Sequence, residues 1–385
     1  MRSLLLTGSV ARDEATILVY PDGWRVLGDA DFMAVFQRDA PLPAASVVAA
    51  LTAKCESDLH AAGVVVHVGL AVVHDDYFCR LPAHIFTYEL GCCGRIVCGD
   101  HTPLGLIPRF PASAIDKEDA CRLLANRTIE CLELSENPLH APPPRSSTSS
   151  EAQGSAPGGN PAPEEELHYR TVKLFLDMAT SLLVFLGAYE PTYGERAQRL
   201  QQLAASLEEQ AKLPFGLKPF AGRVNECTQW KISGGGSDCS SGPEILREAL
   251  NYACQLWRWE LAQLTSAAPD ASPETLFARV AARQSARQKL RGWLYVARRT
   301  GWLRGVRSWP RWIAMGLRRT PRYYVYEATW RLAASIGSPG EPEVRRIRAL
   351  LPVVAGDGNE EGDSRQQLAR EVAWNYRTFL TETRA

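Results

Sequence analysis

The segment from Pro138 to Glu166 is the feature that most constrains how this chain can fold. It consists mainly of proline, serine, threonine, glycine, alanine and glutamate, with almost no large apolar side chain. Such a segment cannot bury enough apolar surface to offset the entropy lost on ordering, so we expect a disordered linker at 138–166. It predicts two folded parts, which the length of 385 residues also favours.

The part before the linker has the pattern of an α+β domain. Short runs of apolar and β-branched residues predict strands at 4–7, 17–20, 24–27, 31–36, 64–73 and 95–98. The Asp22-Gly23 pair is typical of a hairpin turn. Helical spacing predicts helices at 43–62, 85–91 and 113–134, with Ser113 as the N-cap of the last. We therefore expect a mixed sheet with flanking helices at 1–112 and a connecting helix at 113–137.

The part after the linker has helical periodicity along most of its length. The periodic stretches are 168–213, with a break near Glu190-Pro191, then 243–335 and 364–382. A stretch rich in glycine and serine at 232–243 predicts a flexible loop. We expect 167–385 to form an α-helical domain.

Two aspartates in one predicted strand carry the main chemical signal. Asp29 and Asp31 are two residues apart, and because side chains alternate along a strand, both carboxylates leave the same face. Ala30 and Phe32 are then expected to point into the core. Neighbouring carboxylates repel each other unless a cation lies between them, and Mg²⁺ prefers such oxygen ligands. Two such ions can activate an attacking hydroxyl and stabilise a pyrophosphate leaving group.

A glycine and a serine follow the first predicted strand. Gly8 has no side chain to keep a phosphate away from the backbone, and the Ser9 hydroxyl and the following N–H groups can donate to it. These residues predict a phosphate-binding turn beside the two aspartates.

The stretch Leu6-Thr7-Gly8-Ser9-Val10-Ala11-Arg12-Asp13-Glu14, followed by Gly28-Asp29-Ala30-Asp31-Phe32, resembles the polymerase-β-like nucleotidyltransferase superfamily. The resemblance covers the region from residue 1 to about residue 110. It implies that Gly8 and Ser9 hold the triphosphate of an NTP and that Asp29 and Asp31 bind Mg²⁺. It also implies transfer of a nucleoside monophosphate to a hydroxyl on a small molecule, a nucleic acid or a protein.

Further ligand candidates come with this resemblance. The segment from Lys173 onward is similar to the helical partner domain of some family members, in which a lysine reaches the triphosphate. Lys173 is therefore a candidate NTP ligand, and an exposed ion pair with Asp177 is the alternative. Arg12 and Glu14 either line the nucleotide pocket or form a local ion pair.

The family also supplies a third carboxylate from the next core strand. Here that strand, 64–73, contains His67 but no acid, and His67 is either a base or an ordinary strand histidine. Glu89, or Asp75 and Asp76 just past the strand, can substitute as a third catalytic carboxylate. If none of them does, the alternative is a catalytically weak, nucleotide-binding regulatory module.

The region 283–331 is strongly basic and rich in aromatic residues, and Glu327 is its only acid. Three interpretations stay open. An amphipathic helix on an anionic membrane surface would place aromatic rings at the headgroups. A groove for a nucleic-acid backbone would use the rings as stacking platforms. A helix bundle would bury the tryptophans and leave the arginines solvated or paired.

Composition and the absence of certain motifs limit the partners, compartments and enzyme classes that we expect. The net charge of 0 gives no global argument for a nucleic-acid or membrane partner, and the 10 cysteines form no CxxC pair, so we expect thiols in a reducing compartment rather than zinc. The N-terminus lacks a signal-peptide pattern, and we expect a cytoplasmic protein. Walker A, GxGxxG and GxSxG motifs are absent, which argues against a P-loop kinase, a Rossmann dehydrogenase and an α/β-hydrolase.

Overall fold

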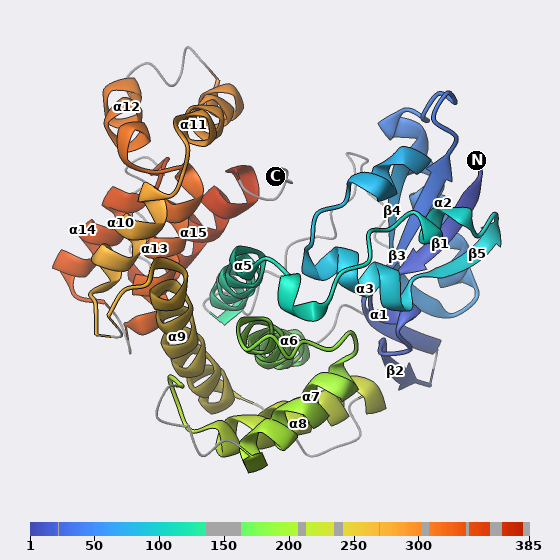
Figure 1. Ribbon diagram of the computed structural model, residues 1–385, viewed down its shortest axis with the longest axis horizontal. Coiled ribbons are helices and arrows are strands. Elements are labelled where there is room, and N and C mark those ends of the chain that lie inside the picture. Colours follow the sequence, from blue (N-terminus) through green and yellow to red (C-terminus); the bar gives the residue numbers. More distant parts are fainter. Residues whose placement is uncertain are drawn as a thin grey trace. The chain divides into compact units, whose positions relative to one another are not determined.

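The structure is a computed structural model that describes residues 1–21, 23–135, 163–206, 213–234, 242–268, 270–301, 308–335, 339–354 and 364–379. The chain divides into two compact units, with the boundary inside one helix, α5 (Lys117–Ser135). The first unit holds all five described strands and the helices α1–α4 and α6–α8, and the second holds most of α5 and α9–α15. The predicted combination of a mixed sheet with many helices is confirmed (Figure 1).

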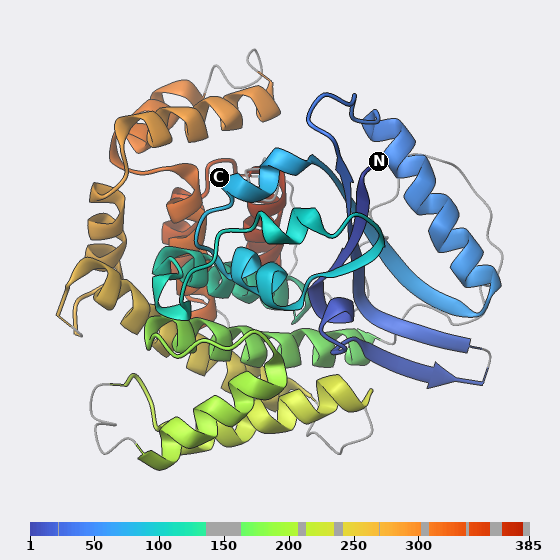
Figure 2. The same cartoon turned by 45° about the vertical axis from the view of Figure 1, so that its right-hand side comes forward.

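The sheet of the first unit has both antiparallel and parallel pairings. Its strands are β1 (Ser3–Thr7), β2 (Thr16–Tyr20), β3 (Gly23–Phe36), β4 (Val64–His74) and β5 (Arg95–Gly99). The order is β2-β3-β1-β5, and β4 pairs with β3. Only the β3–β4 pair is parallel among the described pairings, because α2 (Ala45–Ala61) provides the crossover between them. Figure 2 shows this helix lying along β4.

The long strand β3 organises the sheet, because the predicted strands 24–27 and 31–36 are one continuous element. β2 and β3 form the predicted hairpin, with Tyr20 paired to Gly23. The remaining helical elements of this unit are α1 (Gly8–Ala11), the 3₁₀ helix η1 (Asp75–Arg80), α3 (Ile85–Cys93), α4 (Thr102–Gly105), the 3₁₀ helix η2 (Ala112–Ala114), α6 (Pro163–Phe185), α7 (Tyr193–Ser206) and α8 (Leu217–Ser233).

One face of the sheet packs against η1, α3 and α4. The core there consists of Leu5, Met33, Val35, Phe78, Leu81, Leu90 and Ile107. Met33 and Val35 share the alternation of Asp29 and Asp31, so the two acids lie on the face that becomes the core further along β3. The expectation that Ala30 and Phe32 point into the core is wrong, because both are only half-buried on the other face.

Two predicted boundaries are corrected. Ser113 does not cap the connecting helix, because it lies in η2 and α5 begins at Lys117. The side chain of Asp116 accepts from the Glu118 N–H instead, at 2.9 Å, as an N-cap carboxylate does. The predicted linker also ends too late, since α6 already begins at Pro163. The rest of the linker, and the centre of the predicted loop at 232–243, lie outside the described residues.

The domain division differs from the one the sequence suggested. Helices α6, α7 and α8 belong to the same unit as the sheet rather than to the helices that follow them. Tyr169 of α6 donates to the Leu27 carbonyl of β3 at 2.9 Å, and Thr16 of β2 donates to the Lys231 carbonyl of α8 at 3.0 Å. These buried hydrogen bonds tie α6 and α8 to the β2–β3 end of the sheet.

The second unit is built from helices in its described residues. They are α9 (Pro243–Thr265), α10 (Pro273–Ala282), α11 (Ala286–Thr300), α12 (Trp309–Arg318), α13 (Pro321–Ala334), α14 (Glu341–Leu350) and α15 (Ser364–Phe379). Trp257 lies at its centre and makes edge-to-face contacts with Phe277 and Tyr326. Throughout the described ranges, no helix is both long and apolar enough to cross a membrane.

Candidate active site

The carboxylate of Asp31 lies in a cradle made by two glycines. Asp31 is paired with Thr7 of β1 on one side and with Gly69 of β4 on the other. A Cβ atom added to Gly8 would lie 2.8 Å from Asp31 Oδ2, and one added to Gly69 would lie 2.5 Å from Oδ1. Both distances are too short for real atoms, so this carboxylate occupies the space that side chains would fill. Gly8 also has a φ of +69°, which favours glycine.

Asp29 stands one pleat away from Asp31 and is exposed. Its partner in the sheet is His67 of β4. The His67 ring is half-exposed and its Nδ1 lies 2.5 Å from Glu56 Oε1 of α2. Glu56 Oε1 also accepts from the Val68 N–H at 2.8 Å. A carboxylate of α2 therefore holds this histidine on β4.

The other acids near β4 lie far from this pair. Asp75 and Asp76 follow His74, which pairs with Phe36, whereas Gly69 pairs with Asp31. Six residues of strand separate the two positions by roughly 20 Å. Asp75 instead pairs with Arg2 at 2.6 Å, and Asp76 pairs with Arg80 at 3.0 Å. Neither position suits a third carboxylate beside Asp31.

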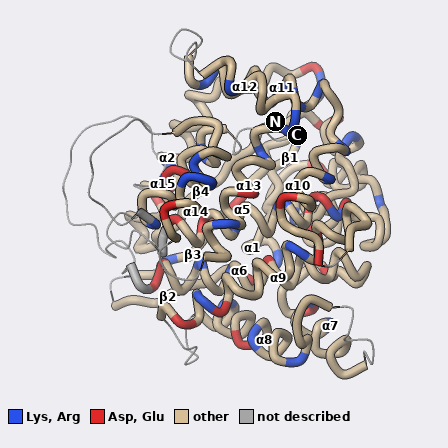
Figure 3. Tube along the Cα trace, turned by 90° about the vertical axis from the view of Figure 1, so that its left-hand side faces the viewer, with Lys and Arg blue, Asp and Glu red and all other residues tan. Residues whose placement is uncertain are grey.

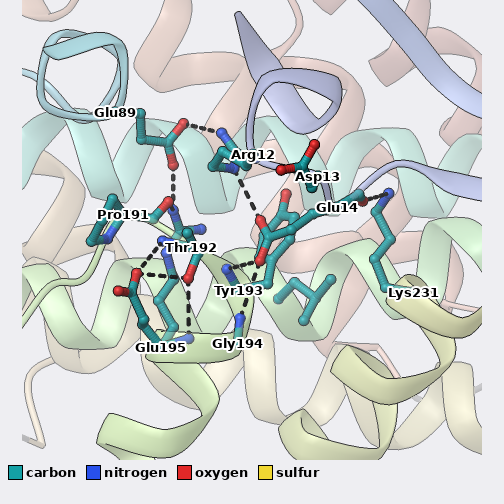
Figure 4. A network of polar contacts seen from close by, with 12 residues as sticks. Arg12, Asp13, Glu14, Glu89, Pro191, Thr192, Tyr193, Gly194, Glu195 and Lys231 are labelled. Carbon is teal, nitrogen blue, oxygen red and sulfur yellow. Dashed lines mark hydrogen bonds and ion pairs between the residues drawn. The ribbon is translucent and has the colours of Figure 1, made fainter. Parts of the chain in front are cut away.

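Arg12 and Glu14 form the local ion pair and also link the sheet to α7 (Figure 4). Arg12 Nε donates to Glu14 Oε2 at 3.0 Å, and both side chains are nearly buried. Glu14 Oε1 accepts from the N–H groups of Tyr193 and Gly194, at 2.6 and 3.2 Å. These are the first residues of α7, so the carboxylate satisfies free N–H groups and faces the positive end of the helix dipole.

Glu89 of α3 is surrounded by donors. Arg12 Nη1 donates to its Oε2 at 2.7 Å, and the Tyr189 hydroxyl donates to its Oε1 at 2.6 Å. Arg196 of α7 also donates to Oε1. Both carboxylate oxygens of Glu89 are thus engaged by groups of the protein.

Arg196 is the centre of this buried network. Its guanidinium donates to the carbonyls of Glu190 and Pro191, both at 2.7 Å, and to the Thr180 hydroxyl at 2.9 Å. It also lies over the rings of Tyr189 and Tyr193, 4.7 and 4.9 Å from their centroids. With only 2% of its surface exposed, it is a structural cation rather than a surface charge.

The network perturbs the groups that it buries. Burial raises the pKa of Tyr193 to about 12, and the nearby Asp177 carboxylate contributes to this rise. Burial also raises the pKa of Tyr189 well above its ordinary value. For Arg196, burial lowers the pKa, but Tyr189 and Glu89 outweigh it and the net shift is upward. The tyrosines are therefore neutral and the arginine is charged at neutral pH.

A second group of cations lies beside the strand that carries Asp29. Tyr169 places its hydroxyl against Gly28, where a Cβ would lie 2.8 Å from the oxygen. The Nζ atoms of Lys173 and Lys231 each lie 5.5 Å from the centroid of the Tyr169 ring. Lys173, the predicted NTP ligand, is therefore close to the Gly28-Asp29 segment of β3.

Lys231 is the more unusual of the two lysines. It is 1% exposed, and its Nζ donates to the Glu14 carbonyl at 3.0 Å. Burial, helped by the neighbouring charge of Lys173, lowers its pKa from 10.5 to about 7. A lysine with that pKa changes charge near neutral pH.

Sequence reasoning missed Lys231, Tyr169, Tyr189 and Arg196. Lys231 is 217 residues from Glu14 in the chain, and no local pattern predicts such a contact. A usable signal existed for the start of α7. Thr192 and Glu195 have the spacing of a capping box, and their side chains do bond each other's backbone N–H groups at 3.2 Å.

Metal-ligating residues are sparse in the part of the chain that the structure describes, where no group of three or more His, Cys, Asp or Glu side chains is arranged to hold an ion. Asp29 and Asp31 form a pair rather than a trio. Mg²⁺ is commonly held by one or two carboxylates, with water and substrate phosphates completing its shell, so the pair fits this ion. The two glycines beside Asp31, which add no side chain to the site, fit it as well.

Comparison with known proteins gives no relative. The chain matches no protein-family model, no curated protein and no solved structure.

Proposed function

We propose that the first unit is a Mg²⁺-dependent nucleotidyltransferase, which moves a nucleoside monophosphate from an NTP to an acceptor hydroxyl. The observation that carries the proposal is the position of Asp31. Its carboxylate lies between the backbones of Gly8 and Gly69, one pleat from Asp29 and directly beside the Gly8-Ser9 turn. Because Gly8 and Gly69 carry no side chain, the Asp31 carboxylate lies against the backbone of both neighbouring strands, beside a turn whose N–H groups can bind a phosphate.

Each residue has a stated role in this proposal. Asp29 and Asp31 would hold Mg²⁺, and two ions are expected as in related chemistry. Bound there, Mg²⁺ supplies charge neutralisation for the phosphates and for the leaving pyrophosphate. Gly8 and Ser9 would donate backbone and hydroxyl groups to the triphosphate, and Lys173 would bind it from α6.

The proposed reaction forms one bond and breaks one bond at the α-phosphorus of the NTP. The acceptor oxygen bonds to the α-phosphorus, and the bond from that phosphorus to the bridging oxygen of the pyrophosphate breaks. The proton of the acceptor hydroxyl passes to water. Preorganised cations around the phosphates stabilise the charge that shifts to the pyrophosphate.

Glu89 and Arg12 are better assigned as positioning residues than as a third catalytic carboxylate and an NTP ligand. Both oxygens of Glu89 accept hydrogen bonds from Arg12, Arg196 and Tyr189. Binding of a metal by Glu89 would leave the buried Arg196 without its carboxylate and Arg12 with Glu14 alone, which is costly. The network instead fixes α3 and α7 against the Gly8-Ser9 turn.

A catalytically weak, nucleotide-binding module is the second candidate. The residues of β4 opposite Asp29 and Asp31 are His67 and Gly69, so no acid stands where the family places its third carboxylate. A site with two carboxylates can bind Mg²⁺ and NTP without orienting the acceptor hydroxyl well.

The test is pyrophosphate release from each of the four common NTPs with Mg²⁺ and pooled acceptors that carry hydroxyl groups. Wild type is compared with Asp29→Asn/Asp31→Asn, and Asp58→Asn on α2 is the matched control, since that exposed carboxylate pairs only with Lys54 among the described contacts. Release that needs Asp29 and Asp31 but not Asp58 supports the transferase. NTP binding without release, detected as a shift in Tm, supports the binding module. The absence of both contradicts the proposal.

A further inference from the structure

Helices α11 and α12 present apolar side chains to solvent in regular rows. Leu290 and Leu294 are one turn apart on α11, and the former is 62% exposed. Trp309, Ile313 and Leu317 repeat every four residues along α12, with Ile313 61% and Leu317 78% exposed. Residues at this spacing lie on one side of a helix, so each helix has an apolar row facing water. We call these five residues the apolar rows.

The rows are not the result of loosely packed helices. The two helices lie side by side (Figures 1 and 2), and the opposite side of each is anchored. Trp293 is buried and donates its indole N–H to the Arg319 carbonyl at 2.8 Å. Trp312 is buried and donates to the Pro352 carbonyl at 2.8 Å. Gly316 packs so closely under Trp293 that an added Cβ would lie 3.0 Å from the ring.

The charge around the rows has one sign. Between Thr275 and Tyr326 the sequence contains no Asp or Glu. Some of the basic residues there are structural, because Arg311 donates to carbonyls near the end of α14 and Arg319 pairs with the buried Glu327. The exposed cations of α11 and α12 include Arg287, Arg291, Arg298 and Arg318. Figure 3 marks the basic positions of both helices in blue.

The exposed side chains favour lipid over nucleic acid. Single-stranded nucleic acid is held by exposed aromatic rings on which bases stack. Among the described aromatic residues of α11, α12 and α13, Trp309 alone is exposed, whereas Trp293, Trp312 and Tyr324 are buried. The other exposed apolar groups are aliphatic, which suits the boundary between headgroups and acyl chains. With 15 and 10 residues, α11 and α12 are shorter than the roughly 20 residues that span a bilayer.

We propose that the apolar rows of α11 and α12, with the arginines beside them, dock the protein onto the surface of an anionic lipid bilayer. The aliphatic side chains and Trp309 enter the headgroup region, and the arginines contact lipid phosphates. This function is independent of the nucleotidyl-transfer site, because it uses residues of the second unit only.

The test is co-sedimentation of the full chain with vesicles. Vesicles of phosphatidylcholine alone are compared with vesicles that contain about 30% phosphatidylglycerol, at about 0.05 M and about 0.5 M salt. We expect binding to the anionic vesicles, weakened by salt. Ile313→Asp/Leu317→Asp should reduce the partition coefficient on the order of tenfold or more, because two inserted groups become charged.

Matched variants separate insertion from general surface effects. Val47→Asp/Leu51→Asp makes the same change on α2, whose exposed pair also has a four-residue spacing but lies in the first unit. It should bind vesicles like wild type. Arg291→Gln/Arg298→Gln should weaken binding about fivefold for each arginine removed. Since all six side chains are exposed, circular dichroism should show unchanged folding.

Four results would overturn the proposal. They are an absence of vesicle binding by wild type, equal loss of binding in the α12 and α2 variants, and equal binding to neutral and anionic vesicles. The fourth is binding of an oligouridine RNA, or formation of a dimer, that depends on Ile313 and Leu317 while vesicles stay unbound.

Discussion

Two pairs of carboxylates in the first unit have opposite surroundings. Glu14 and Glu89 accept hydrogen bonds from arginines, a tyrosine and backbone N–H groups, and their oxygens are occupied by the protein itself. Asp29 is exposed, and Asp31 lies between two glycines that add no side chain to the space around its oxygens. The first pair holds helices together, whereas we propose that the second pair binds Mg²⁺.

The difference teaches where to look for chemistry. A charged group can be buried only when it is paired and hydrogen-bonded. The hydrogen bonds that Glu14 and Glu89 accept therefore explain these two carboxylates as parts of the fold. Asp31 differs in that glycines flank it on both neighbouring strands, so no side chain stands at those two positions. We therefore expect substitutions of Glu14 or Glu89 to change stability, and substitutions of Asp29 or Asp31 to change activity.

The largest expected effect is a split between Asp31→Asn and Glu89→Gln. Asp31→Asn should reduce pyrophosphate release on the order of 10³-fold, because it removes a metal ligand, and should leave Tm nearly unchanged. Glu89→Gln should lower the free energy of unfolding by about 3–5 kcal/mol, because Arg196 stays buried without its carboxylate and Arg12 keeps only Glu14. Urea denaturation and the release assay measure the two effects.

The split also has a clear contrary outcome. If Glu89→Gln folds with wild-type stability and yet loses all release, Glu89 acts on the substrate or metal and the positioning role is wrong. Glu226→Gln is the control for stability, since its partner Arg223 is on the same helix at the surface and such pairs contribute about 0–1 kcal/mol.

The second prediction concerns Lys231, a buried cation beside the saturated pair. Its pKa is about 7 in the folded protein, against 10.5 for an unperturbed lysine, so between these values the unfolded chain binds more protons. The free energy of unfolding should therefore rise by on the order of 4 kcal/mol as the pH increases from about 7 to about 10. Below pH 7 the lysine is charged, and its burial destabilises the fold by that full amount. Lys231→Met should remove most of this slope, which denaturation at a series of pH values measures. An identical slope in the variant would mean that other groups titrate.

Much of the fold of the first unit was predictable from its sequence. Alternating and helical patterns located each strand, the hairpin at Gly23 and the crossover helix, because local side-chain periodicity determines these elements. The inward face of β3 was not predictable, since either parity of that strand is apolar enough to be buried. The membership of α6, α7 and α8 was also missed, because it depends on contacts such as Tyr169 with Leu27, which are distant in sequence.

The residues of the candidate site also divide into those that the sequence predicted and those that it did not. Asp29 and Asp31 are two residues apart in β3, and the pairing of Thr7 with Asp31 places the adjacent Gly8 beside them. Gly69 was not singled out, because its value comes from standing opposite Asp31 on a strand formed 38 residues later by register. Arg196 and Lys231 reach the site from α7 and α8, and nothing in their local sequence distinguishes them from surface cations.

The third prediction tests the glycine cradle. Gly69→Ala would place a Cβ 2.5 Å from Asp31 Oδ1, so the carboxylate must move. Displacement of a catalytic group by about 1 Å slows a reaction, so we expect the rate of pyrophosphate release to fall about 10- to 100-fold. Gly222→Ala in α8 is the control, because nothing lies within 4 Å of its added Cβ, and it should keep full activity. Full activity in Gly69→Ala would show that the position of Asp31 is not what the site requires.

The smallest expected effect is that of a substitution at His168, a buried side chain outside both pairs of carboxylates. It is 7% exposed, and neither ring nitrogen has a hydrogen-bond partner among the described residues. Its ring packs edge-on against Trp230, with the ring centroids 4.6 Å apart. Burial lowers its pKa below 6.5, so the folded state binds fewer protons and stability should fall as pH drops below that value. His168→Phe keeps the aromatic contact and removes two unsatisfied polar atoms, so it should stabilise the fold by about 1–3 kcal/mol and flatten the acid limb of stability against pH. Destabilisation instead would show that the imidazole nitrogens make a bond in solution, and His168 would then belong with the saturated groups.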